Sequence, residues 1–555
     1  MNTCVLCLVA VLMSATASRA QWLRTIHDGF TDEWTGWPVL AVDPAGDHAV
    51  DLQLLQAARD ETSLTFRLRL GTEFLLQESN TLRMLLDTDC NPATGTSVEG
   101  LGAELVWTFG SRSGTYRQGA TTITVRHQHL GLRTLPTHSS TDYEITLDLA
   151  ALPDGTHPLF PLDSLRAVFQ VPSGDRLPAA GHATVQIGSG SLPALPNTPL
   201  PRTGDGTLRV AAWNVLFGSL FDTGLTASYD RLLTALAPDI IAFEEVWDQS
   251  AAQTVTRLNQ LVPELGPWTA VKRDVGNIIA ARFPIRTSWL VQSGYRESAA
   301  LIDASAVLGD SLLFVACHLR ASGANAERQQ EADGLIKFLH DARNPGGAIT
   351  LRAGTPIVLA GDFNLVGDRQ QLTTLLTGDI VDNATYGPDS PPDWDGSDLA
   401  DLVPRFANRP EVATWWNNSS TYLPGRLDFI LTTDSVLEAV RSGVVATPFL
   451  GDSLLAAWNL EAGDSWSASD HFIVWADLRL PQSSVEAPQL HIQRQADASL
   501  LLSWEAVSGA AAYRVEQAWT LGAPWMEVGV VTGTALVLPP PGQTDQRLFR
   551  AIALR

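Results

Sequence analysis

The stretch Ile357-Val358-Leu359-Ala360-Gly361-Asp362-Phe363-Asn364 joins an apolar run to two polar side chains. An apolar run of this length is typical of a buried strand, and Gly361 lets the backbone turn as it leaves the sheet. Asp362 and Asn364 flank an apolar residue, so at the two-residue period of a strand both polar side chains point to the same side. A carboxylate beside an amide at a strand end suits the binding of a phosphoryl group and a divalent cation, although the same residues are also ordinary turn chemistry.

Other apolar runs between residues 207 and 480 also carry a polar residue at or near one end, and segments with helical spacing separate them. These polar residues are Asn214, Glu245, His318, Asp428 and the pair Asp470-His471. An α/β scaffold builds an active site in this way, because strand ends from distant sequence positions meet at one edge of a sheet. The sequence therefore predicts a central α/β domain with one polar site.

The chain is long and acidic. Its 555 residues suggest roughly three domains of ordinary size. The 37 Lys and Arg against 60 Asp and Glu give a net charge of −23, which argues against tight, non-specific adhesion to nucleic acid. This charge leaves phosphodiester hydrolysis open, because a bound metal ion supplies positive charge locally. Cys90 and Cys317, which we expect in different domains, do not make a disulfide framework.

Composition and periodicity divide the chain into six segments: a signal peptide (1–20), a β-sandwich (21–188), a linker (189–206), the α/β domain (207–480), a second linker (481–488) and a small β domain (489–555). The apolar run 5–13, followed by small residues, is typical of an export signal, with a membrane anchor as the alternative. We therefore expect a secreted or periplasmic protein without a transmembrane segment in the mature chain.

Asp87, Asp89 and Asn91 place oxygen-bearing side chains at alternate positions of a loop that is closed by Gly95. Such alternation resembles a calcium loop, because Ca²⁺ takes several oxygen ligands from one short segment. An ion-free loop of Asx turns accounts for the same residues equally well. Both interpretations stay open at the level of sequence.

Taken in order, the motifs of the central segment resemble the endonuclease/exonuclease/phosphatase superfamily, which has the DNase I-like fold. The matching marks are Trp213-Asn214, Phe243-Glu244-Glu245-Val246, Gly276-Asn277-Ile278-Ile279 leading to Arg282-Phe283-Pro284-Ile285, Cys317-His318-Leu319, Gly361-Asp362-Phe363-Asn364, Arg426-Leu427-Asp428-Phe429-Ile430 and Ser469-Asp470-His471. The resemblance implies a four-layer α/β sandwich flanked here by two all-β sandwich domains. Glu244 stands where the family usually has Gln, and Ala281 where it often has Ser.

The resemblance also implies a phosphodiesterase that depends on Mg²⁺ or Mn²⁺. The residues that match the family's functional positions are Asn214, Glu245 and Asp470 for the metal, and His318, Asp362, Asn364, Asp428 and His471 for catalysis. In this scheme His471 is the general base and Asp428 fixes its tautomer. His318 protonates the leaving group or binds the phosphate, while Asp362 and Asn364 orient phosphate and water.

The resemblance implies that the substrate is a phosphoester in nucleic acid, nucleotide or phospholipid. A secreted nuclease-like phosphodiesterase is the leading expectation, and a lipid (sphingomyelinase-like) phosphodiesterase or phosphatase is the alternative. A third hypothesis is a non-catalytic extracellular binding scaffold. Arg282, Trp415 and Trp416 are candidate substrate contacts, and the paired tryptophans either stack on a base or sugar or anchor the long 382–425 insertion.

The outer segments resemble accessory modules. The motifs Asp28-Gly29-Phe30-Thr31-Asp32-Glu33-Trp34, Asp87-Thr88-Asp89 and Gly100-Leu101-Gly102-Ala103-Glu104 are similar to the family 9 carbohydrate-binding-like sandwich. Trp34 and Trp37 either form an exposed sugar platform or are buried in the sandwich. The segment around Trp504 and Tyr513 is similar to a fibronectin type III module, which implies a spacer or attachment role.

Overall fold

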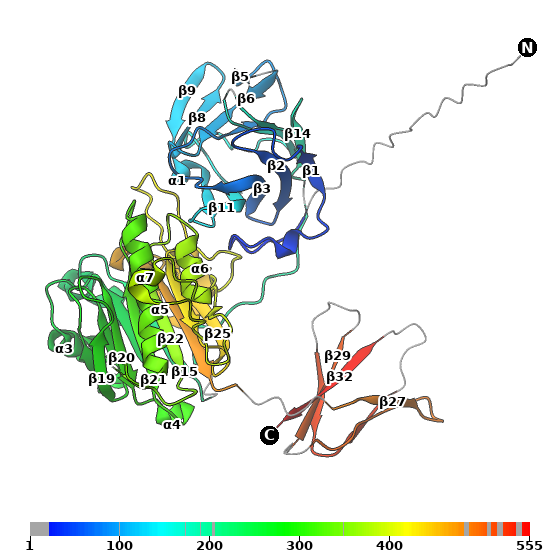
Figure 1. Ribbon diagram of the computed structural model, residues 1–555. Helices are drawn as coiled ribbons and strands as arrows, with labels where there is room; N and C mark the ends of the chain where they lie inside the picture. Colours follow the sequence, from blue (N-terminus) through cyan, green and yellow to red (C-terminus); the bar gives the residue numbers. More distant parts are fainter. Residues whose placement is uncertain are drawn as a thin grey trace, which may run out of the picture. The chain divides into compact units, whose positions relative to one another are not determined.

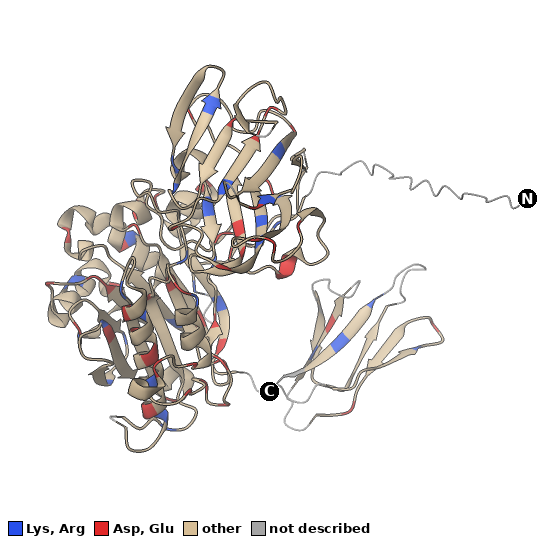
Figure 2. Cartoon of the chain, turned by 45° about the horizontal axis from the view of Figure 1, so that its top comes forward, with Lys and Arg blue, Asp and Glu red and all other residues tan. Residues whose placement is uncertain are grey.

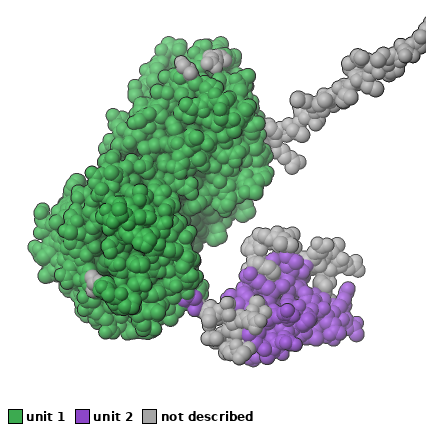
Figure 3. All heavy atoms as spheres, in the orientation of Figure 1, with its two compact units in different colours: residues 1–480 green, residues 481–555 purple. Residues whose placement is uncertain are grey.

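The structure is a computed structural model that describes residues 22–554 apart from 99, 173, 189, 203–205, 348, 482–487, 508–511, 519–525 and 540–546. The chain divides into two compact units, residues 1–480 and 481–555 (Figure 3). The predicted signal peptide, residues 1–20, lies outside the described residues, as do parts of both predicted linkers. Among the helices that are described, none combines the length and the apolar character needed to cross a membrane.

The central part of the first unit contains two six-stranded sheets. One has the strand order β17-β18-β16-β15-β26-β25, and the other β19-β20-β21-β22-β24-β23. The strands of the first are β15 (Leu208–Asn214), β16 (Ile240–Glu244), β17 (Thr269–Val271), β18 (Ile278–Ala281), β25 (Glu438–Val445) and β26 (Ile473–Arg479). Those of the second are β19 (Ile285–Leu290), β20 (Glu297–Ile302), β21 (Leu312–His318), β22 (Ile357–Asp362), β23 (Ala400–Asp401) and β24 (Asp428–Thr432).

Helices flank both sheets. They are α2 (Thr226–Leu236), α3 (Ala251–Leu261), α4 (Ser305–Leu308), α5 (Asn325–Arg343), α6 (Gln370–Thr377), α7 (Asn383–Tyr386), α8 (Asp452–Trp458) and α9 (Asp464–Ala468), with short 3₁₀ turns at η2 (Ser219–Phe221), η3 (Thr223–Leu225), η4 (Pro263–Leu265) and η5 (Thr447–Phe449). In Figure 1, α5, α6 and α7 lie over the second sheet. Ser250 and Gln253 form a capping box at the start of α3, which satisfies two backbone N–H groups at that end.

Alternation along the strands separates three apolar cores. Val210 and Ala212 of β15 face the second sheet and share a core with Phe314 and Ile430. The intervening Ala211 and Trp213 face a second core, which the first sheet forms with side chains of α2 and α3. A third core lies between the second sheet and helices α5 and α6. Because successive strand residues point to opposite faces, one sequence pattern supplies two cores, and the layers run helix, sheet, sheet, helix.

The N-terminal part of the first unit is a β-sandwich. Its sheets have the orders β1-β2-β3-β11-β10 and β13-β12-β4-β7-β8-β9, and β14 pairs with β12. The elements are η1 (Asp32–Trp34), β1 (Val39–Val42), β2 (Leu52–Arg59), β3 (Ser63–Phe74), β4 (Arg83–Asp87), β5 (Thr96–Val98), β6 (Leu101–Ala103), β7 (Leu105–Thr108), β8 (Ser113–Gln118), β9 (Thr121–Val125), α1 (His127–Leu130), β10 (Arg133–Leu135), β11 (Ser140–Asp148), β12 (Ser164–Gln170), β13 (Arg176–Leu177) and β14 (Ala183–Gln186). Leu64, Phe66 and Leu68 alternate into its core.

Polar contacts join the sandwich to the central domain within this unit. The Ser139 N–H donates to the Gly367 carbonyl at 2.8 Å, and the His27 N–H donates to the Pro410 carbonyl at 2.8 Å. Arg133 and Glu411 form an ion pair in which both side chains are buried. Figure 2 shows lysines and arginines dispersed over the chain in that view, without a continuous basic stretch.

The second unit is a small β domain with two three-stranded sheets, ordered β27-β28-β31 and β30-β29-β32. Its strands are β27 (His491–Arg494), β28 (Leu500–Ser503), β29 (Ala512–Ala518), β30 (Met526–Val531), β31 (Ala535–Leu538) and β32 (Leu548–Leu554). The Trp504 and Tyr513 rings pack at 5.3 Å between centroids in its core. Two of the residues on which the fibronectin-like resemblance depends are thus core residues, and the third, Trp525, lies outside the described residues.

Candidate active site

Strand register brings the predicted site residues together. Asn214 of β15 pairs with Glu244 of β16, directly before Glu245. On the second sheet His318 pairs with Asp362, and Asp362 pairs with Asp428 on its other side. Polar residues at the ends of five strands, from widely separated parts of the sequence, therefore lie at paired positions on the two sheets.

The Asp362 carboxylate is the centre of this arrangement. Its Oδ2 accepts hydrogen bonds from the side-chain amides of Asn214 at 3.1 Å and Asn364 at 3.0 Å. The Nε2 atoms of His318 and His471 lie 3.7 Å and 3.8 Å from the same oxygen. Burial raises the pKa of Asp362 to about 7, although the cationic form of His471 acts in the opposite direction. Two amides, two imidazoles and a carboxylate thus surround one small space.

His471 is held by Asp428. The ring Nδ1 lies 2.9 Å from Oδ2 of this fully buried carboxylate, which leaves Nε2 directed toward Asp362. The contact keeps a proton on Nδ1, so Nε2 is the nitrogen that takes up and releases the titrating proton. Burial alone would lower the pKa of His471, but the Asp428 and Asp362 carboxylates outweigh it and raise the pKa to about 10.

Glu245 follows β16 in an unusual backbone conformation. Its φ is 63°, in the left-handed region that non-glycine residues rarely adopt, which is a local strain found mostly at functional sites. Its Oε1 accepts from the Asn214 side chain at 3.1 Å and its Oε2 from the Phe217 N–H at 2.9 Å. The strained turn directs a carboxylate that would otherwise follow the strand into the cavity described below.

Asp470 is fixed by the segment 415–425, which we call the 415–425 loop. Asp470 Oδ2 accepts from Trp415 Nε1 at 3.0 Å and from the Asn417 side chain at 3.1 Å. Its Oδ1 is buried without a hydrogen-bond partner among the described residues. An unpartnered buried carboxylate oxygen is costly unless a cation or a donor satisfies it, so the donor set of Asp470 and Glu245 fits a hard divalent cation.

Asn214, by contrast, uses both N–H bonds of its amide on carboxylates, and its carbonyl oxygen accepts from the Leu216 N–H at 3.1 Å. Asn364 likewise donates to Asp362 and to the Leu319 carbonyl, each at 3.0 Å. The two amides therefore position acidic groups in this structure. Asn214 lies next to the predicted metal ligands, and Asn364 next to the predicted phosphate site.

His318 is buried at the end of β21. Burial, helped by the positive charge of Arg296, holds the pKa of His318 well below its usual range. A neutral imidazole donates a hydrogen bond but is a poor source of a proton. The lowered pKa thus fits the phosphate-binding alternative for His318 better than the role of leaving-group acid.

Glu244 is a buried acid that the sequence patterns did not single out as functional. Its two oxygens are buried without hydrogen-bond partners in the part of the chain that the structure describes, and it is fully buried. Burial raises the pKa of Glu244 well above its usual range, and the Asp428 and Asp362 carboxylates add to the effect. The neutral acid resembles the glutamine of the family pattern in size and polarity, which explains how Glu is accommodated there.

Two predicted substrate contacts lie elsewhere. Arg282 pairs at 3.1 Å with Asp239, which precedes β16, whereas Glu245 follows that strand. The structure therefore holds Arg282 at the opposite end of β16 from the site. Trp416 is buried and packs on Phe449 at 4.6 Å between ring centroids, so it anchors the loop. Of the tryptophan pair, Trp415 is the one that lines the site cavity.

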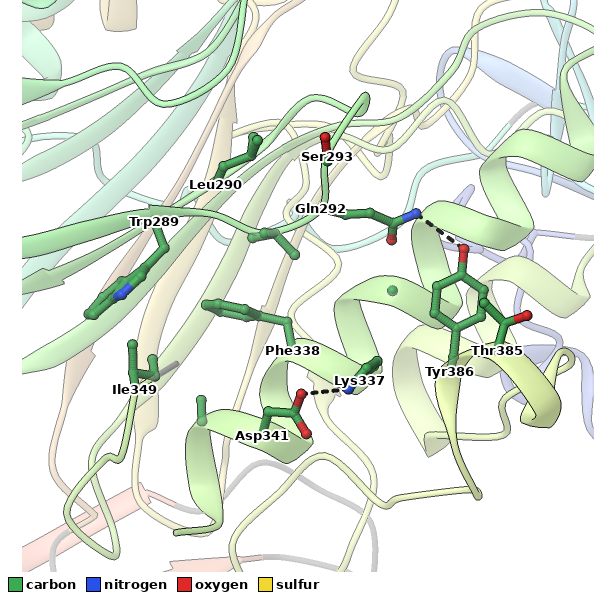
Figure 4. Close-up of a pocket in the computed structure, with 13 residues that line it drawn as sticks. Trp289, Leu290, Gln292, Ser293, Lys337, Phe338, Asp341, Ile349, Thr385 and Tyr386 are labelled. Atoms are coloured by element: carbon green, nitrogen blue, oxygen red, sulfur yellow. Dashed lines mark hydrogen bonds and ion pairs between the residues drawn. The ribbon is translucent and has the colours of Figure 1, made fainter. Parts of the chain in front are cut away.

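A cavity of about 320 Å³ opens over these groups, and we call it the site cavity. Its lining includes the polar residues Glu245, His318, Asp362, Asn364, Asp470 and His471, with apolar side chains around them. A separate cavity of about 400 Å³ is shown in Figure 4, where the Lys337–Asp341 ion pair and the Gln292–Tyr386 hydrogen bond border it. None of the predicted site residues lines this second cavity, so the chemistry belongs to the first.

The predicted calcium loop is only partly as expected. Asp87, Asp89 and Glu104 place ligand oxygens within 4.8 Å of one another. The Asn91 side chain instead accepts from the Ala93 N–H at 3.1 Å and stands outside this group. Glu104 Oε1 is buried without a partner in the described chain, and burial raises the pKa of Glu104. The sequence placed Glu104 in a motif of the sandwich but not among the expected ligands of the loop, and the structure brings it to the loop, where its Oε2 accepts from the Thr88 N–H at 2.8 Å.

If the loop binds calcium, millimolar Ca²⁺ will raise the unfolding temperature of the protein. At a hundredfold excess over Kd the stabilisation is about 2.7 kcal/mol. Differential scanning fluorimetry with Ca²⁺ and with EDTA measures it, and Glu104→Gln removes the shift while Glu245→Gln keeps it. An equal shift in wild type and Glu104→Gln favours the ion-free turn.

The sugar-platform alternative fails for Trp34. This ring is buried and donates from Nε1 to Glu144 at 3.0 Å, so it has no face for a sugar. Trp37 is half-buried and donates to the Ala57 carbonyl at 2.9 Å. The burial alternative therefore describes Trp34.

Comparisons with known proteins bear on the central domain. No curated protein matches the chain. Solved structures similar to it include a beta toxin from Staphylococcus aureus (15% identity, TM-score 0.31, 48% of this chain and 99% of that chain). Sphingomyelinase C from Streptomyces griseocarneus has 15% identity and a TM-score of 0.30, covering 49% of this chain and 99% of that chain. The AP endonuclease LMAP from Leishmania major has 12% identity and a TM-score of 0.31, covering 52% and 93%.

The family match concerns the same residues as the site. Residues 211–471 match the model of the Endonuclease/Exonuclease/phosphatase family, and this range runs from β15 to His471. The modules on either side are β-rich, and their more specific resemblances stay predictions. The central domain of this chain therefore matches the Endonuclease/Exonuclease/phosphatase family, the one that its motifs resemble.

Proposed function

We propose that this protein is a divalent-metal-dependent phosphodiesterase. The observation that carries the proposal is the meeting of the His471–Asp428 pair, at 2.9 Å, with Glu245 and Asp470 around one cavity. The family match supports a hydrolytic phosphoesterase. A non-catalytic scaffold gives no reason for a buried His–Asp pair beside an unpartnered carboxylate oxygen, since both are costly to bury.

Glu245 and Asp470 would hold Mg²⁺ or Mn²⁺, with Asn214 fixing the Glu245 carboxylate. When bound, the ion offsets the negative charge that develops on the phosphoryl oxygens. His471 Nε2 removes a proton from the attacking water as the new P–O bond forms, and Asp428 stabilises the resulting imidazolium. The bond to the leaving oxygen breaks on the opposite side of phosphorus, and that oxygen takes up a proton from solvent. His318 donates a hydrogen bond to a non-bridging oxygen.

Removal of divalent metal will strongly lower the rate of hydrolysis of bis(p-nitrophenyl) phosphate. The ion contributes several kcal/mol of transition-state stabilisation, and each 1.36 kcal/mol is tenfold, so we expect a loss of about 10²- to 10³-fold in EDTA. Mg²⁺ or Mn²⁺ will restore the rate. Glu245→Gln, which keeps an acceptor for the Phe217 N–H, will need about 10- to 100-fold more metal for half-maximal rate. Undiminished activity in EDTA contradicts the proposal.

The sequence leads us to expect a nuclease-like enzyme. The charge of the site cavity instead favours a substrate with few charges, as in the alternative of a lipid phosphodiesterase. The described residues that line the site cavity include several carboxylates and neither lysine nor arginine. Nucleic-acid sites neutralise phosphates with basic side chains. Assays on plasmid DNA, RNA and sphingomyelin, each with Mg²⁺, distinguish these substrates. We further propose export of the enzyme, on the basis of the apolar run 5–13.

A further inference from the structure

The site cavity has walls from two parts of the chain. The central domain supplies the metal and proton-transfer groups, and the N-terminal sandwich supplies Gln77, Glu78 and Thr137. Gln77 and Glu78 lie in the segment 75–82 between β3 and β4, so a sandwich loop borders the space where a substrate would bind. The sandwich is therefore part of the cavity as well as a neighbouring module.

Several contacts hold this wall in place. Glu78 Oε1 accepts from the Tyr422 hydroxyl at 3.2 Å, and Gln77 Oε1 accepts from the Leu423 N–H at 3.0 Å. The Arg112 guanidinium stacks 4.0 Å from the centroid of the Tyr422 ring and donates to the Gln77 carbonyl at 2.8 Å. The sandwich thus holds the 415–425 loop, the same segment that positions Asp470.

The N-terminal sandwich and the central domain approach each other closely at Thr137 and Gly425. A Cβ atom at Gly425 would lie 2.2 Å from the Thr137 methyl group, which no side chain tolerates. The Thr137 hydroxyl donates to the Leu365 carbonyl at 2.7 Å, directly after Asn364. Glycine at 425 therefore permits the contact that places Thr137 in the cavity wall.

The sandwich wall also adds negative charge to the site cavity. Glu78 adds a carboxylate to a lining that also includes Glu245, Asp362 and Asp470. The described lining includes neither Lys nor Arg, and Arg112 and Arg328, which lie outside it, offset part of the Glu78 charge. Apolar and uncharged polar side chains make up the rest of the rim, and the apolar Phe217 is 78% exposed. Such a rim repels additional negative charge on a substrate and favours an uncharged or cationic apolar substituent.

We propose that the N-terminal sandwich determines substrate choice, with Glu78 disfavouring polyanions and so selecting phosphodiesters that carry one negative charge and an apolar substituent. The proposal rests on the proposed phosphodiesterase function of the same site. Glu78 acts on selectivity by its charge and takes no part in the bond-breaking step. Its effect therefore falls on binding of charged substrates and decreases as salt screens the charge.

The test compares Glu78→Gln and Glu78→Lys with wild type on two substrates, bis(p-nitrophenyl) phosphate and a single-stranded oligothymidylate. Gln keeps an acceptor for the Tyr422 hydroxyl, so it removes the charge and leaves the contact. We expect Glu78→Lys to raise kcat/KM for the oligonucleotide relative to the small diester by about 10-fold, mainly through KM, with Glu78→Gln in between. Asp163→Lys is the control, because it makes the same charge change at an exposed sandwich residue outside the cavity lining.

Equilibrium binding separates this proposal from the phosphodiesterase itself. Fluorescence polarisation of labelled oligothymidylate in EDTA requires no turnover, and Glu78→Lys will bind about 10-fold more tightly than wild type at low salt. Equal affinity and an equal substrate ratio in wild type, Glu78→Lys and Asp163→Lys overturn the role of Glu78. If Glu78→Lys binds the oligonucleotide more tightly and the wild type hydrolyses neither substrate, the effect of the Glu78 charge on polyanion binding is supported. The proposed phosphodiesterase function is then overturned.

Discussion

His471→Ala will lower kcat for bis(p-nitrophenyl) phosphate by about 10²- to 10⁴-fold, the usual contribution of a positioned general base. The loss follows from geometry, because Nε2 is the free nitrogen of a ring whose Nδ1 is fixed by Asp428 at 2.9 Å. Initial rates at saturating Mg²⁺ measure it. Circular dichroism and unfolding temperature show whether the fold survives the change.

Asp428→Asn tests the same pair from the other side. An amide donates to Nδ1 and imposes the wrong tautomer on His471, so we expect a loss close to that of His471→Ala, and the double variant will lose little more. His157→Ala is the control, since His157 lies exposed on the sandwich and pairs with Asp154. A rate within about tenfold of wild type for His471→Ala contradicts its role as the base.

Glu411→Gln will destabilise the first unit by about 3–5 kcal/mol, because it leaves Arg133 buried without its main partner. Both side chains are buried, and Glu411 also lies 3.5 Å from His27 Nδ1. Urea unfolding followed by tryptophan fluorescence measures the change. Asp341→Asn, which breaks the exposed Lys337–Asp341 pair, is the control and will cost about 0.5 kcal/mol or less.

The same pair sets a pH dependence. Burial favours the neutral form of Glu411, but Arg133 and His27 outweigh burial and lower its pKa to about 2. A depressed carboxyl pKa stabilises the folded state above the unfolded value near 4.5, and this contribution is lost as the pH falls from there toward 2. Glu411→Gln will have a flatter stability profile over that window. An identical profile in wild type and variant shows that other acids account for the acid sensitivity.

The grouping of the central site residues could be predicted from the sequence because it depends on where strands end and how they pair. Apolar runs that end in Asn214, His318 and Asp362 mark strand ends, and register places strand ends side by side. Sequence patterns did not distinguish Arg282 from the site residues, because a motif does not tell which end of a strand a flanking residue occupies. The sequence also did not indicate which way the side chains of the 382–425 insertion point, so it did not distinguish Trp415, which lines the cavity, from Trp416, which is buried.

Contacts between distant segments lay beyond sequence reasoning. Glu78 and Tyr422 are separated by 344 positions, and neither carries a local signal that would link them. Glu104 belongs to a motif of the sandwich, but that motif does not indicate that it joins Asp87 and Asp89 in place of Asn91. Such pairs depend on how sheets pack after they form, and packing is not encoded in periodicity.

The contact between segment 75–82 and the 415–425 loop has a consequence for how such genes recombine. A crossover within residues 189–206 would join this catalytic domain to a foreign sandwich, and Tyr422 would lose the acceptor that Glu78 provides. Because that loop also holds Asp470, the chimera would inherit the motifs of the enzyme without the support of one of its acidic groups. We therefore expect a functional chimera to need a sandwich that supplies matching partners for Tyr422 and Leu423.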